Sequence, residues 1–311
     1  MSIRKIIVPL GIVMGAGLSY WLMIPGLNFL LAIVFAVVMI MLVIERQHAV
    51  ALAAVISGGI IGLIPGLALT PVSIFVPNWL QLVIPPIAMA WLLNRGFGAG
   101  RSFTIAGLCL AVACIMLYQQ HSTIFMQVID QMHSSVTGMI NGLMSSKGVD
   151  QATMDATADH ITQSFFYIKW LMPGILVAFG LTQLFIAFIL VEKFYTRRDS
   201  YFPGLGPYIY WKIPEKLLYS LALALAVRLV LHGFWQQAAD NVLFVLVLLY
   251  AVGGLSLIEY MLRKLQLPVY LKIVVYLALV VFQIPGLIMA TMIGVFDSYF
   301  DYRKVRAHTL G

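Results

Sequence analysis

The chain has 311 residues, of which 62% are hydrophobic and only 10% are charged. Soluble domains carry about 25% charged residues, so this composition excludes a cytosolic enzyme, a disordered linker and a disulfide-rich secreted module. The net charge of +7 indicates no nucleic-acid partner, because the basic residues lie in short gaps between apolar runs, as in a membrane protein.

Nine apolar segments follow one another along the chain. About 20 helical residues cross the roughly 30 Å of hydrocarbon in a bilayer. Backbone groups in lipid find no water to bind, so each segment must be helical. The sequence predicts an all-α, polytopic integral membrane protein with eight to ten helices. The segments are residues 6–23, 27–44, 49–69, 72–93, 102–118, 167–191, 217–235, 241–261 and 267–295.

The first segment has two interpretations. Arg4 and Lys5 before it, and small residues within it, are also found in cleaved signal peptides. The segment is long, contains Pro9 and leads directly into a second full-length segment. We therefore expect a retained membrane anchor.

Small residues recur every four positions in the first and third segments. Such ridges let helices approach closely in a membrane. They serve either packing within the chain or docking to a separate membrane subunit. The candidate ridge residues are Gly11, Gly15, Ala54, Gly58, Gly62 and Gly66.

The one long polar region, residues 119–166, contains two amphipathic patterns. Apolar residues from Phe125 to Leu143 recur at helical spacing with polar residues opposite, and a second helix begins near Asp150. We predict an external helical hairpin. It is either a lid over a ligand cavity or a structural cap or partner surface.

Ionisable residues inside apolar segments suggest a polar site, because each costs roughly 2.5–3.5 kcal/mol at the bilayer centre. Arg228 lies within residues 217–235, and His232 is four residues later, on the same face of a continuous helix. This pair is our candidate internal polar site; the alternative is that Arg228 extends outward to the membrane surface. Glu259 is placed to pair with Arg263 at i+4.

The last apolar segment is too long for one crossing and is interrupted by Pro285-Gly286. Proline removes a backbone donor and glycine tolerates unusual dihedral angles, so the pair can break a helix. We favour a helix that breaks there and returns as a second arm over one long kinked helix. Pro65-Gly66 and Pro173-Gly174 are further candidate breaks, either simple kinks or parts of a substrate site.

The C-terminal stretch places Asp297 and Asp301 on one helix face. Like charges at i,i+4 repel each other unless a cation neutralises them. Lys304 stands at i+3 from Asp301, and we expect it to neutralise the pair locally.

The distribution of basic residues predicts the orientation. With the N-terminus inside, twelve Lys and Arg residues fall in cytoplasmic gaps and two in outer gaps before the last segment. The protein is therefore predicted to lie in the bacterial cytoplasmic membrane with a cytoplasmic N-terminus. A returning last arm places the C-terminus inside as well. The cytoplasmic set is Arg4, Lys5, Arg46, Arg95, Arg101, Lys193, Arg197, Arg198, Lys212, Lys216, Arg263 and Lys264.

Sequence signatures of catalysis are missing from the chain. It contains no GxxxxGK[ST], HExxH, CxxC or GxSxG motif. His121, His133 and His160 fall in the predicted hairpin without ligand spacing. We expect neither an enzyme, a cofactor nor a metal site.

Two stretches carry a resemblance to a known family. The first is LGPYIYWKIP at residues 205–214, ahead of a long helix. The second is the C-terminal motif of Phe296, Asp297, Phe300, Asp301 and Arg303. Together they resemble the YybS-like family of predicted bacterial membrane proteins, over essentially the whole chain. That resemblance implies distant similarity to the substrate-binding membrane subunits of energy-coupling-factor importers, six-helix proteins that dock a coupling subunit through small-residue ridges.

Two functions remain open at this point. The first is a transport-associated membrane subunit that binds a small solute and works with partner subunits. The alternative is a membrane scaffold that recruits a cytoplasmic partner through a basic loop. The predicted parts are a five-helix membrane part (1–118), the hairpin (119–166), a sixth membrane helix (167–192), the basic loop (193–216) and a C-terminal membrane part (217–311).

Overall fold

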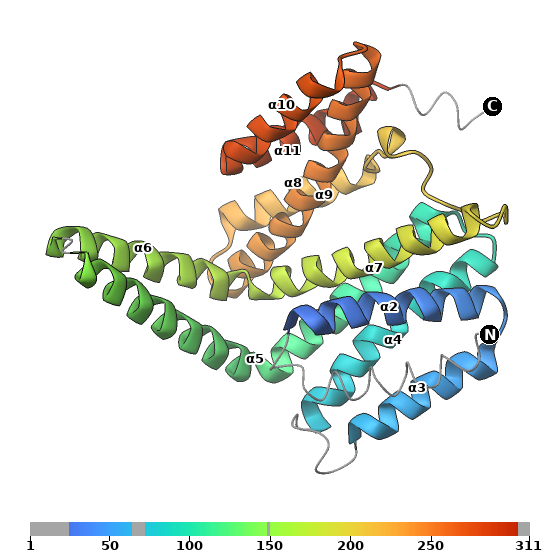
Figure 1. The fold of residues 1–311 in the computed structure, drawn as a ribbon, viewed down its shortest axis with the longest axis horizontal. Coiled ribbons are helices and arrows are strands. Elements are labelled where there is room, and N and C mark those ends of the chain that lie inside the picture. The colour runs from blue at the N-terminus through green and yellow to red at the C-terminus, as the bar shows by residue number, and fades with distance from the viewer. Residues whose placement is uncertain (1–24, 64–71, 148–149, 304–311) are drawn as a thin grey trace. The chain divides into compact units, whose positions relative to one another are not determined.

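A computed structural model describes residues 25–63, 72–147 and 150–303 (Figure 1). Within these ranges the chain forms α-helices α2 to α11 and one short 3-10 helix, η1, with no strand. The chain divides into two compact units. Unit 1 comprises Met1–Lys169 and Leu176–Gly204, and unit 2 comprises Trp170–Ile175 and Leu205–Gly311.

Unit 1 is a helical bundle with a projecting hairpin. Its core contains the fully buried side chains of Phe35 and Met39 from α2, and of Phe75 from α4. Phe29 packs on Phe179 with ring centroids 4.6 Å apart, which joins α2 to α7. The helices are α2 (Pro25–Ile44), α3 (His48–Leu63), α4 (Val72–Asn94), α5 (Ala99–Ser146), α6 (Gln151–Trp170) and α7 (Met172–Thr196).

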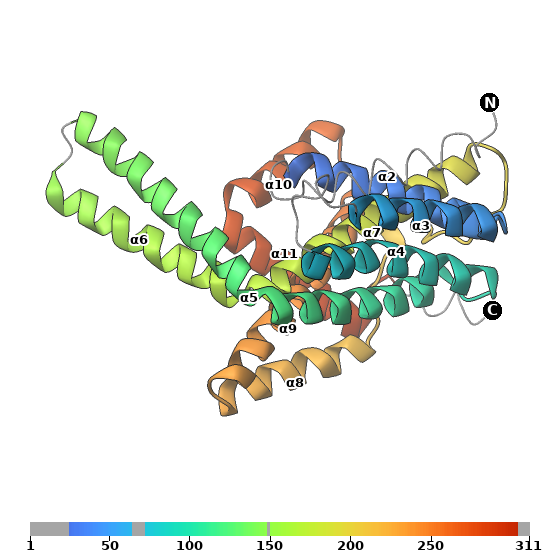
Figure 2. The same cartoon turned by 90° about the horizontal axis from the view of Figure 1, so that it is seen from below.

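The predicted hairpin is present and is formed by the second half of α5 and by α6. α5 is longer than predicted, with 48 residues and a break in helical geometry at His121. Beyond this kink it runs beside α6, and the two helices project away from the rest of unit 1 (Figures 1 and 2). Lys169 forms an ion pair with Asp130 across the hairpin. The position of the hairpin outside a membrane stays a prediction.

Asp150 caps the start of α6, close to where the sequence placed the second helix. Its carboxylate accepts hydrogen bonds from the Thr153 hydroxyl at 2.8 Å and from the Thr153 backbone N–H at 3.0 Å. These bonds favour the ionised carboxylate and lower the pKa of Asp150. An Asp before the first turn satisfies amide groups that have no partner within the helix.

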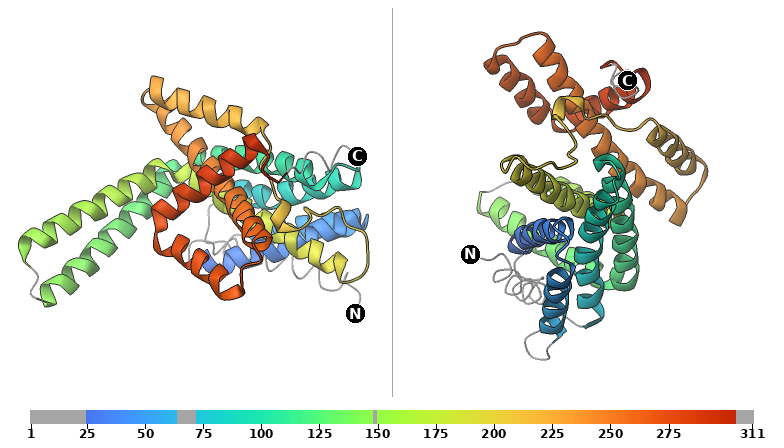
Figure 3. Two further views of the ribbon diagram at one scale, coloured as in Figure 1. Left: turned by 90° about the horizontal axis from the view of Figure 1, so that it is seen from above. Right: turned by 90° about the vertical axis from the view of Figure 1, so that its right-hand side faces the viewer.

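Unit 2 is built on the close crossing of α9 and α11, which Figure 3 shows in two views. At the crossing, Gly254 of α9 and Gly294 of α11 allow backbone to touch backbone. A Cβ atom on Gly254 would lie 1.8 Å from the Ala290 carbonyl oxygen, and one on Gly294 would lie 2.0 Å from that of Tyr250. The elements are η1 (Tyr208–Tyr210), α8 (Lys216–Val230), α9 (Phe234–Lys264), α10 (Val269–Val281) and α11 (Gln283–Phe300).

The last apolar segment is broken, as predicted. α10 and α11 are bent by 113° at Phe282, three residues before Pro285. Pro285 lies in the first turn of α11, where backbone N–H groups have no intrahelical acceptor, so its missing N–H costs no hydrogen bond there. Deeper in a helix the missing N–H would cost one, so the break must precede the proline by less than one turn. Gly286 permits the turn, because a Cβ atom there would lie 2.2 Å from the Leu279 carbonyl oxygen.

The prediction of about nine membrane-crossing segments is not supported. Among the described residues, Ala99–Ser146, Met172–Thr196 and Phe234–Lys264 are long and apolar enough to cross a membrane. The bent pair α10 and α11 brings the number to four if it forms one span. Phe29–Ile44 and His48–Ile60 are shorter apolar helices. The first predicted segment, residues 6–23, lies outside the described residues.

Candidate functional site

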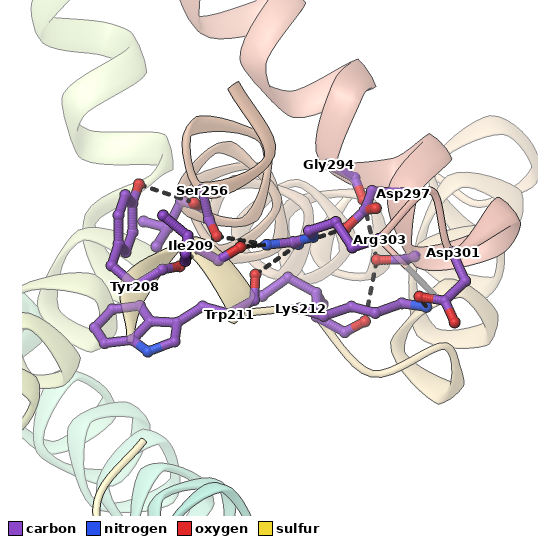
Figure 4. Close-up of polar contacts among 12 residues, drawn as sticks. Tyr208, Ile209, Trp211, Lys212, Ser256, Gly294, Asp297, Asp301 and Arg303 are labelled. Atoms are coloured by element: carbon purple, nitrogen blue, oxygen red, sulfur yellow. Dashed lines mark hydrogen bonds and ion pairs between the residues drawn. The ribbon is translucent and has the colours of Figure 1, made fainter. Parts of the chain in front are cut away.

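The most polar buried site in the described part of unit 2 surrounds Arg303, just after α11 (Figure 4). The side chain of Arg303 has no exposed surface. Nη1 donates to the Ile209 carbonyl at 2.6 Å and to Ser256 Oγ at 2.7 Å. Nη2 donates to the Trp211 carbonyl at 2.7 Å and to the Asp297 carboxylate at 2.5 Å. One guanidinium group therefore joins α9, α11 and the segment 205–214.

Two serines complete the attachment of this segment. Ser256 Oγ donates to the Tyr208 carbonyl at 2.5 Å, and Ser298 Oγ donates to the Ile213 carbonyl at 3.1 Å. Both serines are fully buried. Burial also raises the pKa of the Tyr208 hydroxyl, which donates to the Val252 carbonyl at 3.3 Å. The backbone of an irregular segment thus finds the partners that a strand or helix would otherwise supply.

The two carboxylates of the C-terminal motif are neutralised by Arg303 of the same motif and by Lys212 of segment 205–214. Asp297 pairs with Arg303, and Asp301 Oδ1 lies 2.7 Å from Lys212 Nζ. Lys304, our expected partner, lies outside the described residues. Asp301 has a φ of +51°, so the chain leaves the helix in the left-handed region. Asp adopts this conformation more readily than most residues.

The aromatic residues of the motif face outward, whereas Asp297 and Arg303 are buried. Phe296 and Phe300 are about half exposed and stack on each other with ring centroids 6.3 Å apart. The C-terminal motif therefore has an inner polar face and an outer aromatic face. Its inner face binds segment 205–214, so the structure brings together the two stretches on which the sequence resemblance rests.

The structure does not place Arg228 and His232 on one helical face. α8 ends at Val230, because Leu231 is extended and Gly233 adopts a φ of +66°. Arg228 Nε instead lies 2.8 Å from Asp240 Oδ1, with 45% of the Arg228 side chain exposed. The sequence signal for this earlier end is Gly233, because glycine is common shortly after the last residue of a helix. The Glu259–Arg263 pair is confirmed, with Arg263 Nε 2.6 Å from Glu259 Oε1.

The small-residue ridge is described only in part. Ala54 is buried in the core of unit 1, and Gly58 is buried beside it. A Cβ atom on the neighbouring Gly59 would lie 3.3 Å from Trp79 of α4. At these positions the small residues pack within the chain, one of our two alternatives. Gly11, Gly15 and Gly66 lie outside the described residues. Gly62 lies in α3, but the structure does not describe its surroundings.

Sequence reasoning missed a buried amide network at the start of α7. Asn241 Oδ1 accepts from the Gly174 N–H at 2.6 Å, and Asn241 Nδ2 donates to the Trp170 carbonyl at 3.0 Å. Trp170 Nε1 also donates to Asp240 at 2.9 Å. These bonds stabilise the Pro173-Gly174 helix start. The available signal was the adjacent acidic and amide residues, Asp240 and Asn241, at the edge of an apolar segment.

The site as described fixes a segment in place. Among the described residues, no group of three or more His, Cys, Asp or Glu side chains is arranged to hold a metal ion. Each charge around Arg303 faces an opposite charge, and the segment it fastens is the second half of the predicted basic loop. The arrangement therefore attaches segment 205–214 to α9 and α11.

Comparison with known proteins gives the family. A family model described as "Predicted membrane protein (DUF2232)" matches residues 13–298. No curated protein and no solved structure matches the chain. The YybS-like name and the similarity to energy-coupling-factor subunits stay predictions. Because the match covers nearly the whole chain and the described helices include several apolar ones, the chain belongs to the DUF2232 family of predicted membrane proteins.

Proposed function

We propose that the protein is a transport-associated membrane subunit that binds a small solute and works with partner subunits. The break between α10 and α11 carries the proposal. Irregular backbone at membrane depth is tolerated only where it is buried in protein or lines a water-filled cavity. In transporters, interrupted helices contribute backbone groups to solute sites.

The residues at the break support this role. Phe282 is 62% exposed and Ile284 is 69% exposed, and Gln283 between them has a φ of +33°. The helix ends leave N–H and C=O groups without intrahelical partners. A solute or a partner subunit at this position would satisfy those groups.

A thermal-shift panel of vitamins and metal salts on the purified protein tests the proposal. A solute at 100 times its Kd stabilises by about 2.7 kcal/mol, which raises the Tm by roughly 5–10 °C. We expect at least one compound to produce this shift. Gln283→Ala should reduce it, whereas Gln127→Ala on the exposed hairpin should not. A flat response across the panel contradicts the proposal.

A membrane scaffold is the second candidate, favoured by the attachment of segment 205–214. Arg303 and two serines hold this half of the basic loop, while Arg197 and Arg198 in the other half are exposed. Tyr201, in the same half as these arginines, is 92% exposed. A loop whose backbone is already held in place loses less conformational entropy on binding than a free one.

Pull-down of cytoplasmic proteins with the purified membrane protein tests the scaffold. Arg197→Ser/Arg198→Ser should remove a specific partner without disturbing the Arg303 site. Arg95→Ser/Arg101→Ser is the matched control, because these arginines are also exposed and predicted to be cytoplasmic. Partners retained by the loop variant, or lost equally from both variants, argue against a scaffold.

A further inference from the structure

The second half of α5 carries an apolar stripe that α6 does not cover. The stripe residues lie on one side of the helix at spacings of three and four. α6 contacts a different side of α5, the side of His133. There Thr162 Oγ1 lies 3.3 Å from His133 Nε2, and the ring centroids of Phe165 and His133 are 4.9 Å apart. The exposed fractions are Val128 37%, Met132 55%, Val136 36%, Met139 69% and Leu143 51%.

The stripe contains an open concavity shaped by the helix repeat. It is lined by Val128, Gln131, Met132, Ser135 and Val136. The first four occupy positions i, i+3, i+4 and i+7, which are the four positions that form a hole for one side chain of a facing helix in a coiled coil. This shape fits a second helix better than it fits a bilayer surface, which has no discrete side chains to insert.

The charges near the stripe favour a second copy of the chain as that helix. Asp130 is the only Asp, Glu, Lys or Arg in residues 122–146, and it pairs with Lys169 of α6. Gln131 and Ser135, the two polar residues that line the concavity, are uncharged. Two copies can therefore meet along the stripe without burying or opposing like charges.

We propose that this stripe forms a parallel, two-stranded coiled coil with the same stripe of a second copy. All copies enter the membrane with the same orientation, so a two-fold axis between them runs along the membrane normal. The two helices then run parallel and each residue meets its own counterpart. Met132 and Met139 are seven residues apart and share one heptad position, with Ser135 at the other core position between them.

Disulfide trapping in native membranes tests the pairing. Both native cysteines are free, so the variants are made in a Cys109→Ser/Cys114→Ser background. Met139→Cys should form covalent dimers about tenfold more than Ser134→Cys under mild oxidation, because a disulfide needs Cβ atoms within about 4.5 Å. Ser134 is exposed on the opposite side of the same helix and is the matched control.

A second measurement counts subunits in liposomes by single-molecule photobleaching. Met132→Asp/Met139→Asp should convert two-step to one-step bleaching, whereas Gln127→Asp/Ser134→Asp should stay two-step. Both pairs lie on exposed surface, so an unchanged Tm in both confirms that the fold is intact. Equal trapping at both cysteine positions, trapping to a different protein, or one-step bleaching of the unmodified chain would each overturn the proposal.

Discussion

Replacing Arg303 by Met should lower the free energy of unfolding by about 3–5 kcal/mol, because the change leaves the buried Asp297 carboxylate without its cation. The substitution also removes three further hydrogen bonds, to two backbone carbonyls and Ser256. Denaturant titration in detergent micelles measures the loss. Limited proteolysis should show new cleavage within segment 205–214, because its main attachment is gone.

Controls separate the buried pair from a general effect of charge. Arg303→Lys should also destabilise, since an ammonium group cannot reproduce the planar fork of donors. Arg303→Met/Asp297→Leu should cost less than Arg303→Met, because no unpaired charge remains. Arg263→Met breaks a pair whose arginine is 60% exposed and should cost less than about 1 kcal/mol. Equal losses for Arg303→Met and Arg263→Met would contradict a structural role for the site.

Gly254→Ala should destabilise unit 2 by about 3 kcal/mol, at the upper end of the usual range for overpacking. The added methyl group would meet the backbone of Ala290, which cannot move without separating α9 from α11. Close approach through small residues is a principal means by which helices associate in membranes. Thermal unfolding in micelles, followed by tryptophan fluorescence, measures the change.

Gly138→Ala is the matched control for this substitution. Gly138 also lies within a helix, and a Cβ atom there would meet nothing within 4 Å. Removing a helical glycine should leave stability unchanged or raise it by up to about 1 kcal/mol. A loss for Gly138→Ala as large as that for Gly254→Ala would show that the α9–α11 crossing is not the cause.

Several features of the fold could be predicted because they depend on local chemistry. The amphipathic pattern after Phe125 predicted the hairpin, and Asp150 marked the start of its second helix. Pro285 and Gly286 predicted the broken last segment, because the missing N–H and missing side chain act within one turn. Nine crossings are not supported among the described residues, since apolar composition alone does not separate a spanning helix from a shorter one such as Phe29–Ile44.

The candidate site could be predicted only in its parts. The C-terminal motif and segment 205–214 were both singled out, yet their contact joins residues more than 80 positions apart, as in the Ser298–Ile213 bond. Arg228 was paired with His232 because a continuous helix was assumed, and the extended backbone of Leu231 between them removed that geometry.

Apolar composition was sufficient to determine a helical chain in lipid, because hydrocarbon offers peptide groups no partner outside their own helix. Which cation neutralises Asp297 and Asp301 was decided by the tertiary structure alone. The position of a carboxylate in the sequence does not identify the cation that will pair with it. Here Asp297 pairs with Arg303, which the left-handed turn at Asp301 directs inward. Asp301 pairs with Lys212 from a distant segment.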